Sequence, residues 1–243
     1  MTVRRFFSDS IDEAARAAIL SAEEAHHARD VLRLKVGDAV NVFDGEGREF
    51  SGTLAKLTKT SGEIADVTEV APSAPESNLA ITQASVVIPG DKYDLVVQKA
   101  VELGVVNFIP LTSVRCEIKL KDIERRLQRL RRIALDAAKQ CGRARLMQIA
   151  EPRNVKDVLR EFAEKGVCRI FFSERDGGGL SLASPPEDLA FVIGPKGGWD
   201  DSELAAAREA AFEIVTFGGR IMRAETASIA LTAILQHRFG DIN

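Results

Sequence analysis

The segment FVIGPKGGWDDSELAAAREA, residues 191–210, has the pattern of a buried strand that runs directly into a helix. The apolar run ends at the glycine-rich residues 194–198, and a helix opens near Asp201. Glycines let a backbone approach a ligand closely, and ligands of open α/β sheets dock where the strands end. A tight strand-to-helix turn, capped by Asp200 and Glu203, explains the same residues equally well.

A second segment, TFGGRIMRAETASIALTAILQHRF, residues 216–239, repeats this design. A strand end and a glycine pair lead into an apolar helix that opens with Arg223, Glu225, Thr226 and Ser228. Glu225 near a helix N-terminus is favoured by the helix dipole, so capping is its simplest role. Because the two glycine-containing strand ends are close in sequence, we expect them to line one pocket.

Common nucleotide-binding motifs do not fit these loops. A Walker A loop needs a lysine followed by serine or threonine, whereas Lys196 is followed by two glycines and Trp199. The dinucleotide fingerprint GxGxxG is absent as well. A nucleoside-like ligand would therefore be held by other means.

Outward from these segments, strand-like runs alternate with amphipathic helical patterns. Strands are expected at 79–88, 105–110, 167–172, 189–194 and 213–217, and helices near 93–103, 122–140 with Asp122 as N-cap, 154–165, 201–211 and 224–239. This alternation predicts the α/β class, with a mostly parallel sheet and helices on both of its faces.

The first part of the chain has a different texture. Residues 39–70 contain three short strand patterns separated by the turn-forming stretches DGEG and TSG, which predicts antiparallel hairpins in a small barrel. The segment APSAPES, residues 71–77, has two prolines and little apolar bulk, as a linker does. We therefore expect one domain over residues 1–72 and a second over residues 73–243.

Composition describes an ordinary globular protein with one unusual region. The chain has 243 residues, of which 45% are hydrophobic and 28% charged, and its net charge is -3. This excludes a disordered or fibrous protein. Residues 115–145 nevertheless hold 11 basic and 4 acidic side chains. This basic segment is either a solvated helix face or a surface for a polyanion.

Cysteine, histidine and apolar patterns argue against several classes. The three cysteines and three histidines lack the spacing of a disulfide framework or a metal site. The first residues lack an apolar signal core, and no apolar run approaches the roughly 18 residues of a membrane span. We therefore expect a cytoplasmic protein with reduced thiols, no metal ion and no membrane association.

Five ordered motifs carry a resemblance to a known family. They are RRFF with HHARDVLRLKVGDAVNVFDGEG (26–47), QKAVELGVVNFIPLTSVRCE (98–117), DAAKQCGRARL (136–146), IGPKGGW and FGGRIMRAETA. Together they resemble the ribosomal RNA small subunit methyltransferase E family. The resemblance implies methyl transfer from S-adenosylmethionine to N3 of a uridine in 16S rRNA, on the small ribosomal subunit.

The same resemblance implies the architecture. It suggests a PUA-like β-barrel at the N-terminus, a SPOUT-class domain with a C-terminal trefoil knot, and a homodimer that buries the knot surfaces. Three positions depart from the family pattern: Lys196 and Lys139 stand where the family usually has glutamate, and Trp199 replaces a typical phenylalanine. Because the glycines and Pro195 are kept, backbone recognition of the cofactor is expected to survive.

The resemblance also implies site residues. The cofactor would lie between two loops and a third wall, formed by Leu111, Thr112, Ile193, Gly194, Pro195, Gly197, Gly198, Phe217, Gly218, Ile221, Met222 and Arg223. Ile221 and Met222 would sandwich the adenine ring. Plain core packing is the alternative for both residues, and it suits Ile221 better than Met222.

Chemistry assigns further roles. The neutral N3–H of uridine is a poor nucleophile, so Arg223 would stabilise the imidate anion, and Glu225 would act as base or orient Arg223. An ion pair that closes the knot loop is the structural alternative for both. RNA-binding candidates are Arg4, Arg5, His26, Arg33, Arg115 and Arg143. A catalytically silent RNA-binding protein of the same fold, or a SPOUT enzyme for another RNA position, remains an alternative function.

Overall fold

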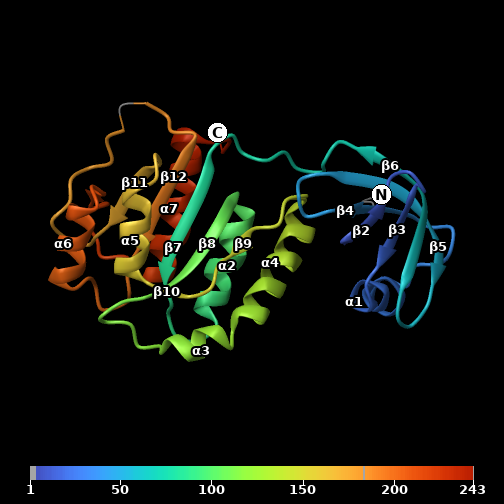
Figure 1. The fold of residues 1–243 in the computed structure, drawn as a ribbon, viewed down its shortest axis with the longest axis horizontal. Helices are drawn as coiled ribbons and strands as arrows, with labels where there is room; N and C mark the ends of the chain where they lie inside the picture. Colours follow the sequence, from blue (N-terminus) through green and yellow to red (C-terminus); the bar gives the residue numbers. More distant parts are fainter. Residues whose placement is uncertain (1–3, 183, 243) are drawn as a thin grey trace. The chain divides into compact units, whose positions relative to one another are not determined.

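The computed structural model describes residues 4–182 and 184–242 (Figure 1). These residues form two compact units, and most contacts of each unit are between its own residues. The first comprises residues 4–76 and 135–146, and the second comprises most of the rest. The domain bounds 1–72 and 73–243 remain a prediction. In the structure, residues 135–146 group with the first unit.

The first unit is built on a curled six-stranded sheet. Its spatial order is β1 (Arg4–Phe7), β4 (Ala39–Phe43), β5 (Glu49–Leu57), β6 (Gly62–Val70), β3 (Ala17–Leu20) and β2 (Ser10–Asp12). All neighbours are antiparallel except β1 and β4. The hairpins expected from DGEG and TSG are present. Side chains of alternate strand residues form a core that includes Phe6, Leu20, Val42, Phe50, Leu54 and Ile64.

Helix α1 (Ala22–His26) continues into a π-helical turn, His27–Val31, within the same unit. The side chain of Ser21 caps α1 by accepting a hydrogen bond from the backbone of Glu24. His26 therefore ends α1, and residues 27–31 form the π-helical turn.

The second unit is built on a parallel sheet. Its spatial order is β10 (Arg153–Asn154), β8 (Val105–Thr112), β7 (Ala80–Val86), β12 (Asp188–Ile193), β11 (Cys168–Phe172) and β13 (Glu213–Val215), and the short β9 (Gln148–Ile149) also pairs with β8. Every pairing is parallel. The predicted α/β class with a mostly parallel sheet is confirmed.

Helices cover both faces of this sheet. They are α2 (Lys92–Glu102), α5 (Val155–Ala163), α6 (Asp201–Glu209) and α7 (Ala224–Phe239). Helix α3 (Leu120–Glu124) and the beginning of α4 (Leu127–Cys141) belong to the same unit, whereas the end of α4 groups with the first unit. On β7, Ala84 packs into the core with α5 and α6. The preceding residue, Gln83, accepts a hydrogen bond from Thr232 of α7. Successive strand residues point to opposite faces, so α7 lies across the sheet from α5 and α6.

The prediction of one helix over residues 122–140 is wrong in one respect, because the structure has two helices there. Helix α3 ends at Glu124, and α4 begins at Leu127. The N–H of Arg126 bonds to the carbonyl of Ile123, three residues back instead of four, which ends the first helix. The N-cap of α3 is Lys119, not Asp122. The spacing of buried residues continues through the break, so the sequence pattern did not indicate the break.

Two predictions about helix ends are confirmed. Asp200 and Glu203 form the expected capping box at the start of α6. Gly104 ends α2 with a positive φ of 77°. Within the described residues, no helix is both long and apolar enough to cross a membrane. The same residues contain no group of three or more histidine, cysteine or acidic side chains arranged to hold a metal ion.

Candidate functional site

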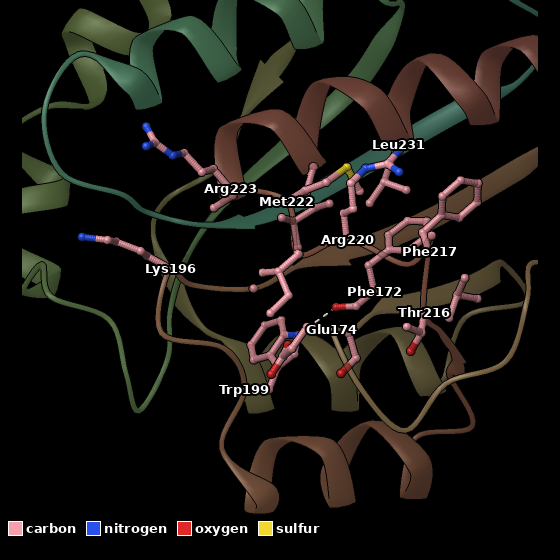
Figure 2. Close-up of a pocket in the computed structure, with 18 of the residues that line it drawn as sticks. Phe172, Glu174, Lys196, Trp199, Thr216, Phe217, Arg220, Met222, Arg223 and Leu231 are labelled. Carbon is pink, nitrogen blue, oxygen red and sulfur yellow. Dashed lines mark hydrogen bonds between the residues drawn. The ribbon is translucent and has the colours of Figure 1, made fainter.

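A cavity of about 340 Å³ lies at one edge of the parallel sheet, where three neighbouring strands end. Because β11, β12 and β13 are parallel neighbours, the loops that follow them meet there (Figure 2). Both glycine-containing segments line this first cavity, as the sequence predicts. Its lining includes Phe172, Glu174, Ile193, Gly194, Pro195, Lys196, Trp199, Thr216, Phe217, Gly218, Gly219, Arg220, Ile221, Met222, Arg223 and Leu231.

Trp199 forms the rigid wall of the first cavity. Its fully buried indole N–H donates a hydrogen bond of 2.8 Å to the carbonyl of Phe172, at the end of β11 (Figure 2). Its ring also lies 4.4 Å from that of Phe171, measured between centroids. A Cβ on Gly194 would lie 2.8 Å from the indole carbon Cε2. Glycine is therefore required at 194 for the tryptophan to pack there.

Ser173 and Glu174 form a wall that sequence reasoning missed. The N–H of Ser173 donates to the carbonyl of Val215, and the N–H of Gly177 donates to Oγ1 of Thr216. Between them, Glu174 faces the cavity. The signal was present in the sequence, because Glu174 follows a buried strand by two residues, as the two segments already singled out follow theirs.

A second cavity of about 410 Å³ adjoins the first through shared residues. Its lining comprises Ile88, Pro89, Lys92, Glu117, Lys196, Arg223 and Glu225. Lys196 and Arg223 line both cavities. A ligand in one cavity therefore shares two cationic side chains with a ligand in the other.

Glu225 belongs to the second cavity. Its Oε1 lies 2.7 Å from Nζ of Lys92. The hydrogen bond from Lys92 lowers the pKa of Glu225, and the positive charges of Lys92 and Arg223 act in the same direction. Glu225 is therefore ionised at neutral pH and is a weak proton acceptor. This arrangement favours its orienting role over the role of general base.

Lys196 and Arg223 have free head groups. Within residues 4–182 and 184–242, neither forms a hydrogen bond or a direct ion pair. Both side chains extend to the same side of the first cavity (Figure 2). The charge of Arg223 acts on Glu225 from a distance, as the pKa of that carboxyl shows. The structure thus places two unpaired cations between the cavities.

Four predicted cofactor residues do not line either cavity. Leu111 is fully buried in the core beside α5. Oγ1 of the adjacent Thr112 lies 3.5 Å from the carbonyl of Arg153. Gly197 and Gly198 lie between Lys196 and Trp199, which do line the first cavity, but are not themselves part of the lining. Ile221 does line the first cavity and is 89% exposed, which excludes the alternative that it packs in the core.

Two predicted RNA-binding arginines lie inside the first unit, which argues for structural roles. Arg5 is bidentate to the fully buried Glu49, with bonds of 3.1 and 2.9 Å, and its other N–H groups meet backbone carbonyls. Burial acts to raise the pKa of Glu49, but the hydrogen bonds from Arg5, Asn41 and Ser73 outweigh it and lower that pKa. Arg143 is likewise buried and bidentate to Glu76, at 3.0 and 2.7 Å.

The other predicted RNA-binding residues are accessible. Arg4 and Arg33 are exposed, and His26 is exposed beside Asp30, at 2.6 Å. Arg115, in the second unit, donates a 3.1 Å hydrogen bond to the carbonyl of Gly197. Arg115 therefore supports the loop that carries Lys196.

Comparison with known proteins agrees with this arrangement. Residues 75–236 match the RNA methyltransferase domain family, and residues 20–66 match the RNA methyltransferase PUA domain family. Ribosomal RNA small subunit methyltransferase E of Mesomycoplasma hyopneumoniae is 31% identical over 228 residues, which cover 93% of this chain and 96% of that relative. The protein of the same name from Synechocystis is 30% identical, covering 88% of this chain and 71% of that relative.

Two solved structures are similar over the whole chain. A ribosomal RNA small subunit methyltransferase E from Neisseria gonorrhoeae, bound to S-adenosyl methionine, has a TM-score of 0.90, 29% identity and complete coverage of both chains. A Legionella pneumophila methyltransferase, in complex with the bound cofactor SAM, has a TM-score of 0.88 and 28% identity, and the match covers 99% of this chain and 100% of that one.

Proposed function

The chain belongs to the ribosomal RNA small subunit methyltransferase E family, and from this premise we propose that it transfers a methyl group from S-adenosylmethionine to N3 of a uridine in 16S rRNA. The observation that carries the proposal is the pair of adjoining cavities that share Lys196 and Arg223. The first has the features of a cofactor site, and the second has those of a site for the target nucleotide.

The residues of the first cavity fit the cofactor. Its 340 Å³ lies in the range of about 300–1,000 Å³ that is usual for ligand sites. A Cβ built on Gly218 or Gly219 would meet nothing within 4 Å, so this loop borders open space. The residues that would hold the cofactor are Ile193, Gly194, Pro195, Phe217, Gly218, Ile221, Met222 and Arg223. When bound, the cofactor supplies an electrophilic methyl group on a sulfonium.

The second cavity supplies the electrostatics that the target needs. Three cations, Lys92, Lys196 and Arg223, face two carboxylates, Glu117 and Glu225, so the lining is positive overall. Loss of the N3 proton leaves negative charge on the uridine ring, which Arg223 is placed to stabilise. Glu225 is held by Lys92, and the charge of Arg223 acts on it from a distance. Lys196, where the family usually has glutamate, adds a second positive charge.

RNA contacts would come from the accessible basic residues. Arg4, His26 and Arg33 lie on the first unit, which contains the match to the PUA domain family. Arg115 lies in the second unit, near the loop of Lys196. Arginines suit phosphate contacts and base stacking. The RNA partner in this proposal is 16S rRNA of the small ribosomal subunit.

The trefoil knot and the homodimer are part of the same proposal. The chain leaves edge strand β13 and returns through α7, which packs on α2 and β12, as a knotted crossing would require. The outer face of α7 carries partly exposed apolar residues, among them Ile229 and Ile234, and the preceding Ile221 is exposed. A second copy of the chain would cover this face. Light scattering after size exclusion would give twice the mass of one chain.

Mass spectrometry of rRNA tests the reaction. Small-subunit rRNA from cells that lack the protein should miss one 3-methyluridine, and the wild-type gene should restore it. A gene with Arg223→Gln should restore it weakly. Loss of a methyl group at another position would favour the other SPOUT activity. Unchanged rRNA, with no S-adenosylhomocysteine binding by calorimetry, would favour the silent RNA-binding protein.

A further inference from the structure

The carboxylate of Glu174 is an unexplained feature of the first cavity. It lies two residues beyond β11 and is the sole acidic side chain among the described residues that line this cavity. Within the part of the chain that the structure describes, it accepts no hydrogen bond, and its one ion-pair contact is a loose 3.6 Å approach to Nε of Arg175. Both oxygens therefore keep unused acceptor capacity.

The surrounding residues leave room for the carboxylate of Glu174. A Cβ on Gly198 would lie 2.5 Å from Oε1 of Glu174, so glycine at 198 leaves the room that the carboxylate fills. Gly198 also has a φ of +71°, which favours glycine. On the other side, Arg175 donates to the carbonyl of Trp199 at 3.0 Å and to Asp201 at 2.7 Å. These bonds fix the residue next to Glu174, while the carboxylate itself lies beside the cavity without a strong partner.

The position of Glu174 indicates which part of a ligand it meets. The end of the first cavity that adjoins the second is marked by Lys196 and Arg223, and the group to be transferred must lie there. Both cations extend away from Glu174 (Figure 2). The remaining walls are mainly apolar, with Phe172, Phe217 and Leu231, and suit a flat base. The sugar connects the base to the reactive end.

We infer that Glu174 binds the two ribose hydroxyls of the adenosyl cofactor, and that it determines the preference for a ribonucleoside. A vicinal diol offers two O–H donors, and a carboxylate is the group in proteins that accepts both. Rossmann enzymes use an acidic residue on the ribose for the same purpose. The inference rests on the proposed function, since it takes the first cavity as the cofactor site.

Calorimetry with four ligands tests the inference. The ligands are S-adenosylhomocysteine, 5′-methylthioadenosine, which lacks the amino acid part, and the 2′-deoxy form of each. Glu174→Gln should weaken the binding of S-adenosylhomocysteine and of 5′-methylthioadenosine by the same factor. We expect about 10- to 100-fold, as for a lost hydrogen bond to a charged group. The 2′-deoxy forms should bind the wild type more weakly than their parents and lose this penalty in the variant.

Controls separate the possible results. Asp176→Asn removes a nearby carboxylate that lies outside the cavity lining and should leave all four dissociation constants unchanged. Equal melting temperatures for the wild type and Glu174→Gln would show that the variant is folded. If only the binding of S-adenosylhomocysteine became weaker, Glu174 would contact the amino group of its amino acid part, and the inference would be overturned. Unchanged binding of both parent ligands would overturn it as well. Failure of the wild type to bind S-adenosylhomocysteine would instead overturn the cofactor site itself.

Discussion

Basic residues inside the first unit are paired with carboxylates, whereas two at the cavities of the second unit are not. Arg5 and Arg143 are buried and each is bidentate to a carboxylate, Glu49 or Glu76. Lys196 and Arg223 line two cavities and, among the described residues, form no direct ion pair. All four are basic residues in motifs that carry the family resemblance. The difference is whether the fold brings a carboxylate within reach.

This contrast has an energetic meaning. A buried charge needs a partner, since desolvation without one is costly, so Arg5 is bound to the structure of its unit. An unpaired cation at a cavity keeps its charge for a ligand, and a charge already in place can stabilise a developing anion. We therefore expect substitutions in the first group to alter stability and substitutions in the second group to alter activity.

The largest effect should come from Arg5→Met. It leaves Glu49 buried without its main partner, so the first unit should lose about 3–5 kcal/mol of stability. Trp199, the one tryptophan, lies in the second unit and does not report on the first. Hydrogen exchange of the β4 and β5 amides in the full chain is the suitable measurement.

Arg33→Met is the matched control, because Arg33 is exposed, and it should change the same exchange rates little. Arg5→Met with Glu49→Leu should recover part of the loss, since no charge is then left buried. Unchanged exchange in Arg5→Met would contradict the structural role of the pair.

The next effect should be that of Arg223→Gln on methyl transfer. Removal of one preorganised charge that stabilises a developing anion costs about 100- to 1,000-fold in rate. We expect a fall of that order in kcat/KM, with the melting temperature unchanged. Arg208→Gln, on the exposed side of α6, should retain full activity. A destabilised but fully active Arg223→Gln protein would assign Arg223 to the structural group instead.

Acid should act on the first group through Glu49. Its pKa is lower in the folded state than the ordinary 4.5, so the folded carboxylate binds protons less readily than the unfolded one. Its contribution to stability is therefore complete above pH 4.5 and is lost as the pH falls toward the lowered pKa. Once the slower intrinsic exchange in acid is corrected for, the protection of the β5 amides should fall on acidification in the wild type, and less steeply in Glu49→Gln. Parallel profiles for the two proteins would refute this.

The smallest effect should be that of Arg33→Gln on RNA binding. One lost phosphate contact weakens binding about two- to threefold and lowers the salt dependence by about one charge. Fluorescence anisotropy with a 16S rRNA fragment at several salt concentrations measures both. Arg48→Gln is the control from the same unit, because Asp44 and Glu13 already pair with Arg48. Equal effects of the two variants would remove Arg33 from the RNA surface.

Much of the fold follows from local sequence patterns. Alternating strands and helical periodicity predicted the parallel sheet, and the turn stretches predicted the hairpins of the first unit. The two glycine-containing strand ends do line one cavity. The break between α3 and α4 escaped prediction because a single hydrogen bond, from Arg126 to Ile123, ends the helix without changing the spacing of buried residues.

The sequence by itself determined the order of the elements, the family and the edge of the sheet where ligands are expected, because periodicity, turns and motifs are properties of neighbouring residues. Only the tertiary structure decided which charges are free. Arg5 meets Glu49 across 44 residues, Arg143 meets Glu76 across 67, and Glu174 fills the space left by Gly198. Such partners come from distant segments, and the free energy of burying a charge depends on them.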